Sequence, residues 1–179
     1  MILETTFIKD LILITPRVYR DDRGYFMESY NQKKIEKVIH EKFVQDNESL
    51  SNKNVLRGLH LQRPPHAQAK LMRVIQGSIL DVAVDLRKDS DTYGKYFKHV
   101  LSGDNKKQLF VPRGFAHGFL CLEDQTIVNY KCSDYYNSKS EDSILWNDPE
   151  LNIDWEINNP ILAEKDKKAK NFTTFDNPF

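Results

Sequence analysis

The chain has 179 residues, the size of one domain, and 40% of them are hydrophobic, enough to bury a core. Its 26 basic and 26 acidic side chains cancel, so we expect no overall field that would hold a nucleic acid. The apolar runs have strand length, so we expect no membrane partner. Because no apolar signal segment follows Met1, and only Cys121 and Cys132 could pair, a cytoplasmic location fits best. We therefore expect a single domain over 1–179.

The first 45 residues contain signals for one hairpin and one helix. Asp-Asp-Arg-Gly at 21–24 is typical of a tight turn between two extended segments, which predicts an N-terminal hairpin. Further on, Ile35, Val38 and Ile39 recur at helical spacing among charged and amide side chains. Asn31 stands where an N-cap would satisfy the first free backbone N–H groups. One short helix is expected there.

From Val55 onward, the pattern is typical of many short antiparallel strands. Gly, Pro, Asn and Asp interrupt the β-branched runs at short intervals. Apolar side chains occupy alternate positions from 80 to 86, while Asp81 and Asp85 lie between them, so one face should be apolar and the other charged near a rim. The lysine-rich segment 165–170 could form a second short helix packed on the strands. The fold class predicted is mostly β, a barrel or jelly roll with one or two short helices.

Polar side chains gather inside four apolar segments, at 57–62, 68–70, 114–119 and 129–131. Strand alternation places His60 on one face of its strand and Arg57 on the other. Taken singly, such a histidine is more often a hydrogen-bonded structural residue than a catalytic base. The same holds for the other polar groups here, which are ordinary residues of strands and strand ends. Their joint occurrence favours one shared cavity, because barrels bind ligands in their mouths.

A metal site is the main alternative for histidines in a small β-barrel. Metal-binding jelly rolls of the cupin type carry a His-x-His pair, a nearby acid and a later histidine. Here Gln62 stands two residues after His60, and the segment up to Gly77 contains Lys70 and Arg73 but no acid. A nearby ammonium would also repel a divalent cation. We therefore expect no metal.

The polar segments belong to a longer series of motifs that resembles the dTDP-4-dehydrorhamnose 3,5-epimerase (dTDP-4-keto-6-deoxyglucose 3,5-epimerase) family. One of them reads Val-Leu-Arg-Gly-Leu-His at 55–60, and another reads Pro-Arg-Gly-Phe-Ala-His-Gly-Phe at 112–119. The remaining matching segments are 20–28, 43–47, 68–73, 81–87, 146–149 and 162–166. The resemblance therefore extends over nearly the whole chain.

The resemblance implies a cupin-fold jelly roll, usually dimeric, that epimerises a nucleotide-linked 4-keto sugar without metal or coenzyme. It assigns His60 as the base that removes a proton beside the ketone and Asp166 as the carboxylate that orients it. Lys70 would stabilise the enolate oxygen. Tyr130 would return a proton to the opposite face.

Recognition of the nucleotide diphosphate needs cations and an aromatic platform. The resemblance implies the following substrate-binding residues: Arg23, Phe26, Glu28, Gln45, Asn47, Arg57, His117 and Lys165. In the family, the segment that corresponds to Arg23 reaches the site of a neighbouring subunit. A homodimer whose interface includes the N-terminal strands is therefore expected.

Several alternatives remain open on the sequence. The substrate could be dTDP-4-keto-6-deoxyglucose or a GDP-linked 4-keto heptose, in L-rhamnose or a related surface-polysaccharide pathway. The enzyme could invert C3, C5 or both, or act as a 3,4-ketoisomerase. A non-catalytic sugar-binding cupin is less consistent with the residues, because a binder has no use for both His60 and Tyr130 on opposite faces.

Overall fold

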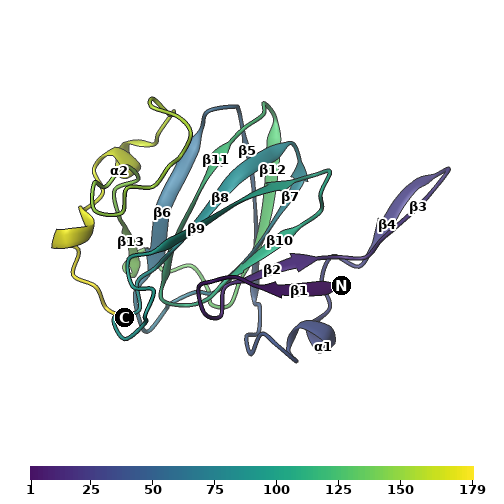
Figure 1. The fold of residues 1–179 in the computed structure, drawn as a ribbon, viewed down its shortest axis with the longest axis horizontal. Coiled ribbons are helices and arrows are strands. Elements are labelled where there is room, and N and C mark those ends of the chain that lie inside the picture. The colour runs from purple at the N-terminus through teal and green to yellow at the C-terminus, as the bar shows by residue number, and fades with distance from the viewer.

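The computed structural model describes residues 1–179 as two facing antiparallel β-sheets with a projecting hairpin (Figure 1). In sheet order, the six-stranded sheet consists of β1 (Ile2–Thr5), β2 (Ile12–Thr15), β10 (Gln108–Val111), β7 (Lys70–Gln76), β12 (Thr126–Cys132) and β5 (Gln45–Ser51). The five-stranded sheet consists of β13 (Glu141–Ser143), β6 (Leu56–Gln62), β11 (Phe115–Cys121), β8 (Ser78–Asp85) and β9 (Tyr96–Ser102). The predicted mostly-β jelly roll is confirmed.

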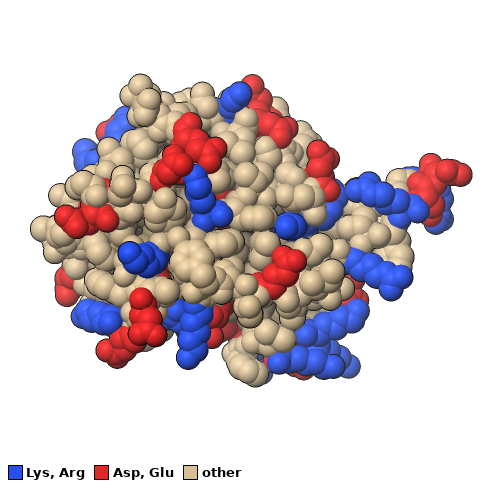
Figure 2. All heavy atoms as spheres, in the orientation of Figure 1, with Lys and Arg blue, Asp and Glu red and all other residues tan.

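The N-terminal hairpin and the first helix both lie where the sequence predicted them. Strands β3 (Val18–Asp21) and β4 (Gly24–Met27) form the hairpin, which projects from the body and carries both charge signs (Figures 1 and 2). Helix α1 (Gln32–Ile35) starts at Asn31, whose Oδ1 accepts a hydrogen bond from the backbone N–H of Lys34 at 3.3 Å. The helix ends at Ile35, so Val38 and Ile39, from whose spacing it was also predicted, lie beyond its end.

The alternation of β8 separates two apolar cores. Ile79 and Ala83 point between the two sheets, where they join the core that includes Met72 and Leu109. The alternate side chains, Leu80 to Leu86, point away from the opposite sheet and pack with Trp155 and other residues of the C-terminal segment. The apolar face predicted for this strand therefore lies outside the barrel, and the face that carries the aspartates points inward.

The C-terminal segment covers that outer face and brings its helix beside β6 (Figure 1). The backbone N–H of Leu56 donates to the carbonyl of Ile161 at 3.0 Å, and Ile161 in turn donates to Asn54 at 2.8 Å. Helix α2 (Glu164–Lys167) follows, and η1 (Phe172–Thr174) comes later. Neither α-helix is long and apolar enough to span a bilayer.

Candidate active site

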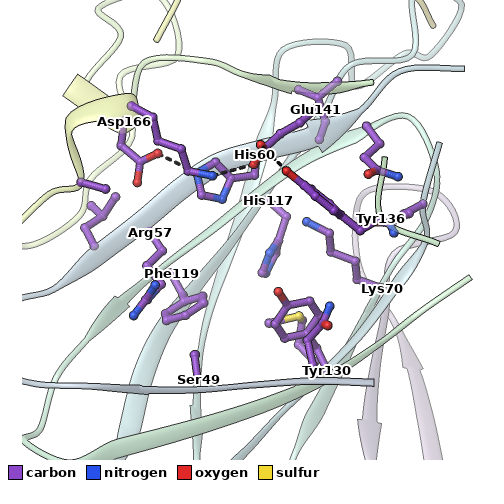
Figure 3. Close-up of a pocket in the computed structure, with 18 of the residues that line it drawn as sticks. Ser49, Arg57, His60, Lys70, His117, Phe119, Tyr130, Tyr136, Glu141 and Asp166 are labelled. Carbon is purple, nitrogen blue, oxygen red and sulfur yellow. Dashed lines mark hydrogen bonds and ion pairs between the residues drawn. The ribbon is translucent and has the colours of Figure 1, made fainter. Parts of the chain in front are cut away.

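A cavity of about 810 Å³ opens between the two sheets (Figure 3). Strands β6 and β11 form one wall, strands β5, β7 and β12 form the other, and α2 and β13 contribute to the rim. The predicted site residues that line it are Gln45, Asn47, Arg57, His60, Lys70, His117, Tyr130, Lys165 and Asp166. Segments far apart in the sequence therefore converge on one cavity of a size that suits a small-molecule ligand.

His60 and Asp166 form a hydrogen-bonded pair at the cavity wall. The imidazole Nε2 lies 2.7 Å from the Asp166 Oδ1, and Asp166 is almost completely buried, with 2% of its side chain exposed. With Nε2–H donating to the carboxylate, Nδ1 is left as the basic nitrogen. Burial lowers the pKa of His60, while the Asp166 carboxylate opposes that shift. The imidazole is therefore neutral at neutral pH and able to accept a proton.

Lys70 and Tyr130 face this pair from the opposite sheet. Lys70 starts β7 and Tyr130 lies on the adjacent strand β12, where Tyr130 is paired with Met72. Burial lowers the pKa of Lys70 and raises the pKa of Tyr130. The Lys70 side chain forms no hydrogen bond or ion pair with the rest of the chain, so its amine is available to a ligand. The phenol is protonated at neutral pH and able to donate a proton.

Arg57 lines the same cavity as His60, so the prediction that strict alternation separates them is wrong. His60 pairs with His117, whereas Arg57 pairs with Phe119, so two residues between these pairs on β6 oppose one on β11. The extra residue is a β-bulge, which changes the side to which the following side chain points. The strands are also unusually close here, since a Cβ on Gly58 would lie 2.5 Å from the backbone of β11.

The guanidinium of Arg57 is held from one side only. Its Nε and Nη2 donate to the Ser51 hydroxyl at 3.1 and 3.0 Å. The remaining N–H groups form no hydrogen bond within the chain. A planar guanidinium held in this way is suited to contact two oxygens of a phosphate group.

Three predicted binding residues, Arg23, Phe26 and Glu28, do not enter this cavity. They lie on or just after the projecting hairpin, where 90% of the Arg23 side chain and 69% of Phe26 are exposed. Glu28 contacts Lys34 at 2.6 Å and Asn31 at 3.0 Å within its own chain. Within one chain, the hairpin therefore does not contribute to the cavity described here.

Three residues at or beside the cavity were not assigned from the sequence: Asp81, Tyr136 and Glu141. Asp81 lies behind the predicted binding residue His117, whose Nε2 is 2.7 Å from Asp81 Oδ1, and both side chains are buried, which makes a second histidine–carboxylate pair. Glu141 and Tyr136 line the rim near His60 (Figure 3). A buried aspartate inside an apolar strand was a usable signal for Asp81. Nothing in the sequence pattern marked Glu141, because β13 is short and polar.

No group of three or more His, Cys, Asp or Glu side chains is close enough to hold a metal ion. The histidines of the cavity each pair with one carboxylate. The other nitrogen of each ring is a single potential metal ligand, and the Lys70 side chain lies on the opposite wall of the same cavity. The chemistry of this cavity is that of acid–base groups.

Comparison with known proteins shows which family the chain matches. The family model described as dTDP-4-dehydrorhamnose 3,5-epimerase matches residues 5–174. A dTDP-4-dehydrorhamnose 3,5-epimerase of Shigella flexneri is 48% identical over 173 residues, which are 96% of each protein. Among solved structures, the dTDP-4-dehydrorhamnose 3,5-epimerase of Elizabethkingia anophelis is 50% identical, with a TM-score of 0.94 over 99% of this chain and 98% of that one.

A second solved structure carries a ligand. It is the dTDP-6-deoxy-D-glucose-3,5-epimerase of Legionella pneumophila in complex with dTDP-4-keto-L-rhamnose, which is 45% identical, with a TM-score of 0.93 over 97% of this chain and 94% of that one. The matched family model, the identities and the coverage all extend over nearly the full chain. The chain belongs to the dTDP-4-dehydrorhamnose 3,5-epimerase family.

Proposed function

We propose that this enzyme converts dTDP-4-keto-6-deoxyglucose into dTDP-4-keto-L-rhamnose by inverting C3 and C5, as a step of L-rhamnose biosynthesis. The observation that carries the proposal is that the His60–Asp166 pair and Tyr130 lie on opposite walls of one cavity. The names of the relatives favour a dTDP-linked hexose over a GDP-linked heptose. The assigned steps need no metal or coenzyme.

In the first step, His60 removes the proton from the carbon next to the ketone. The C4 carbonyl acidifies the protons at C3 and C5, because the electron pair left behind is delocalised onto the ketone oxygen as an enolate. Asp166 stabilises the imidazolium that forms and keeps the ring oriented. The proton therefore moves from carbon to Nδ1 while Nε2–H remains bonded to the carboxylate.

In the second step, the enolate oxygen is stabilised and the carbon is reprotonated. Lys70 has no competing partner in the chain, so its N–H groups are available to the oxygen on which the negative charge develops. Tyr130 then donates its phenolic proton to the face opposite His60, which inverts the centre. Once His60 has released its proton to solvent and the Tyr130 phenolate has regained one, the same cycle at the other carbon accounts for the second inversion.

The nucleotide diphosphate would be held at the rim of the cavity. Arg57 and Lys165 supply cations, and the amides of Gln45 and Asn47 supply donors. We also propose a single-domain subunit that forms a homodimer through its N-terminal strands. The exposed hairpin would then complete the nucleotide site with the partner subunit's Arg23, Phe26 and Glu28.

A cytoplasmic location is also proposed for the enzyme. Both of its cysteines, Cys121 and Cys132, are buried free thiols, which is typical of proteins in a reducing compartment. A nucleotide-linked substrate would be available in the same compartment.

The function is tested by turnover in D2O followed by NMR. Incubation with dTDP-4-keto-6-deoxyglucose should place deuterium at both C3 and C5 of the product. Deuterium at one carbon alone would identify a single-centre epimerase, and a shifted ketone would identify a 3,4-ketoisomerase. No deuterium with this substrate, but incorporation into a GDP-linked 4-keto heptose, would contradict the nucleotide and the sugar proposed here.

A further inference from the structure

The N-terminal hairpin has no core of its own to hold it in place. Its two strands, β3 and β4, pair only with each other, and both are largely exposed. A two-stranded hairpin is at best marginally stable in water by itself. The direction in which this hairpin projects from the body (Figure 1) is therefore set by its few contacts with the rest of the chain.

Two side chains of the body hold the hairpin, one at its root and one near its tip. At the root, Gln108 Nε2 donates to the backbone carbonyl of Ser29 at 2.8 Å. Near the tip, Lys106 Nζ donates to the hydroxyl of Tyr25 at 3.1 Å and lies 4.2 Å from the centroid of the same ring, which is a cation–π contact. No other side chain of β3 or β4 forms a hydrogen bond or an ion pair with the body.

The loop between β9 and β10, which carries Lys106, is held by its own hydrogen bonds. Asn105 Oδ1 accepts from the backbone N–H groups of Ser102 at 3.1 Å and Lys107 at 2.9 Å. Its Nδ2 donates to the carbonyl of Val100 at 2.9 Å. Lys106 is only 9% exposed, which is unusual for a lysine. A buried lysine on such a loop is suited to fix the position of the ring that it contacts.

We propose that Lys106 is a positioning residue of the shared active site, because its contact with Tyr25 orients the hairpin toward the cavity of the partner subunit. The inference rests on the proposed function, in which the hairpin completes the nucleotide site of a neighbouring chain. Arg23 lies two residues before Tyr25 and Phe26 follows it directly, so a shift of Tyr25 moves both. Lys106 does not line the cavity of its own chain, so its effect should appear in the partner's site.

The first test is steady-state turnover of dTDP-4-keto-6-deoxyglucose by Lys106→Met, which removes the ammonium and keeps most of the stem. KM should rise about 5- to 10-fold, the scale of one partly buried cation contact. The value of kcat should change by less than about twofold, because His60 and Tyr130 stay in place. An unchanged KM, or a loss confined to kcat, would overturn the proposal.

Two further variants show whether the contact itself is responsible. Tyr25→Phe keeps the ring and its cation–π contact but loses the hydroxyl, so KM should rise by only about two- to threefold. Lys107→Met is the matched control, because it removes the same charge from the next residue, whose side chain forms no hydrogen bond or ion pair. Its KM should equal that of the wild type. An equal rise in Lys107→Met would assign the effect to the net charge of the loop and overturn the role of Lys106.

Mixed dimers show in which subunit's site Lys106 acts. Heterodimers are isolated with a different affinity tag on each chain, and His60→Ala in one chain leaves one competent site. When Lys106→Met is paired with His60→Ala, that site receives the intact hairpin of the His60→Ala chain, so KM should be that of the wild type. When the wild type is paired with a chain that carries both substitutions, the competent site receives the displaced hairpin, so KM should rise. The opposite pattern would overturn the proposal, because Lys106 would then act within its own subunit.

The outcomes also separate this inference from the proposed function. An unchanged KM of Lys106→Met beside normal wild-type turnover would remove the positioning role and leave the epimerisation. If the wild type does not turn over the 4-keto sugar, calorimetric titration with dTDP takes the place of KM. Weaker dTDP binding by Lys106→Met, but not by Lys107→Met, would then support the positioning role without the epimerisation, and equal binding would remove both.

Discussion

Replacement of Asp166 by asparagine keeps the shape of the side chain beside His60 and removes its charge. The contact is a short hydrogen bond, 2.7 Å long, to an almost completely buried carboxylate. Hydrogen bonds to charged groups contribute about 1.5–3 kcal/mol and neutral ones about 0.5–1.5 kcal/mol. The imidazolium should therefore lose about 1–2 kcal/mol of stabilisation when asparagine replaces the carboxylate. If that loss appears fully in the transition state, kcat falls about 5- to 30-fold.

The same substitution should also shift the pH dependence of kcat in a defined direction. Burial lowers the pKa of His60 and Asp166 opposes that shift, so the pKa should be lower still in Asp166→Asn. Turnover requires the neutral imidazole, so the acid limb of the kcat profile should move to lower pH while the plateau falls. Asp134→Asn is the matched control, because Asp134 lies 3.5 Å from His66 in a more exposed pair outside the cavity. An acid limb at higher pH, or an unchanged plateau, would refute the reasoning.

Three further changes test other parts of the account. Lys70→Met should lower kcat by about 10²–10³-fold with a smaller change in KM, as measured by steady-state kinetics, because the lysine acts where charge develops. The Asp85 carboxyl is buried, but hydrogen bonds from Arg87, Ser90 and Thr92 outweigh that burial and lower its pKa from 3.8 to about 2. This carboxylate should therefore contribute about 2 kcal/mol to the free energy of unfolding above pH ~4, and this contribution is lost as the pH falls to ~2. Urea titrations should show this loss in the wild type and not in Asp85→Asn. If subunits share sites, mixing inactive Arg23→Ala with inactive His60→Ala should restore part of the turnover, and no recovery despite proven subunit exchange would contradict shared sites.

Local patterns were sufficient to predict much of the fold. Asn31 was placed as an N-cap from its side-chain chemistry alone, and its Oδ1 does accept the expected hydrogen bond. The alternation within β8 also held over the whole strand. It did not reveal which face points inward, because the outer face is covered by Trp155 and its neighbours, some seventy residues further along the chain. Because both faces of β8 are buried, the sequence of this strand alone does not show which face points into the barrel.

The site was predicted in part, for a related reason. The side chains of His60 and Tyr130 lie on strands whose patterns the sequence shows, so their convergence on one cavity followed once the strands were paired. The position of Arg57 depends on a bulge between β6 and β11, which is a property of the pairing and not of either strand. Glu141 was missed because its strand pairs only at the edge of the sheet.

The central claim is that His60 removes the proton and Tyr130 returns it to the other face. The most direct test compares deuterium exchange with inversion in Tyr130→Phe, using the 4-keto sugar in D2O and NMR. The variant keeps the base and the ring but loses the hydroxyl, so the account predicts that exchange next to the ketone continues while inversion falls by about 10²-fold or more. Inversion of both carbons at the wild-type rate would contradict the assignment of Tyr130.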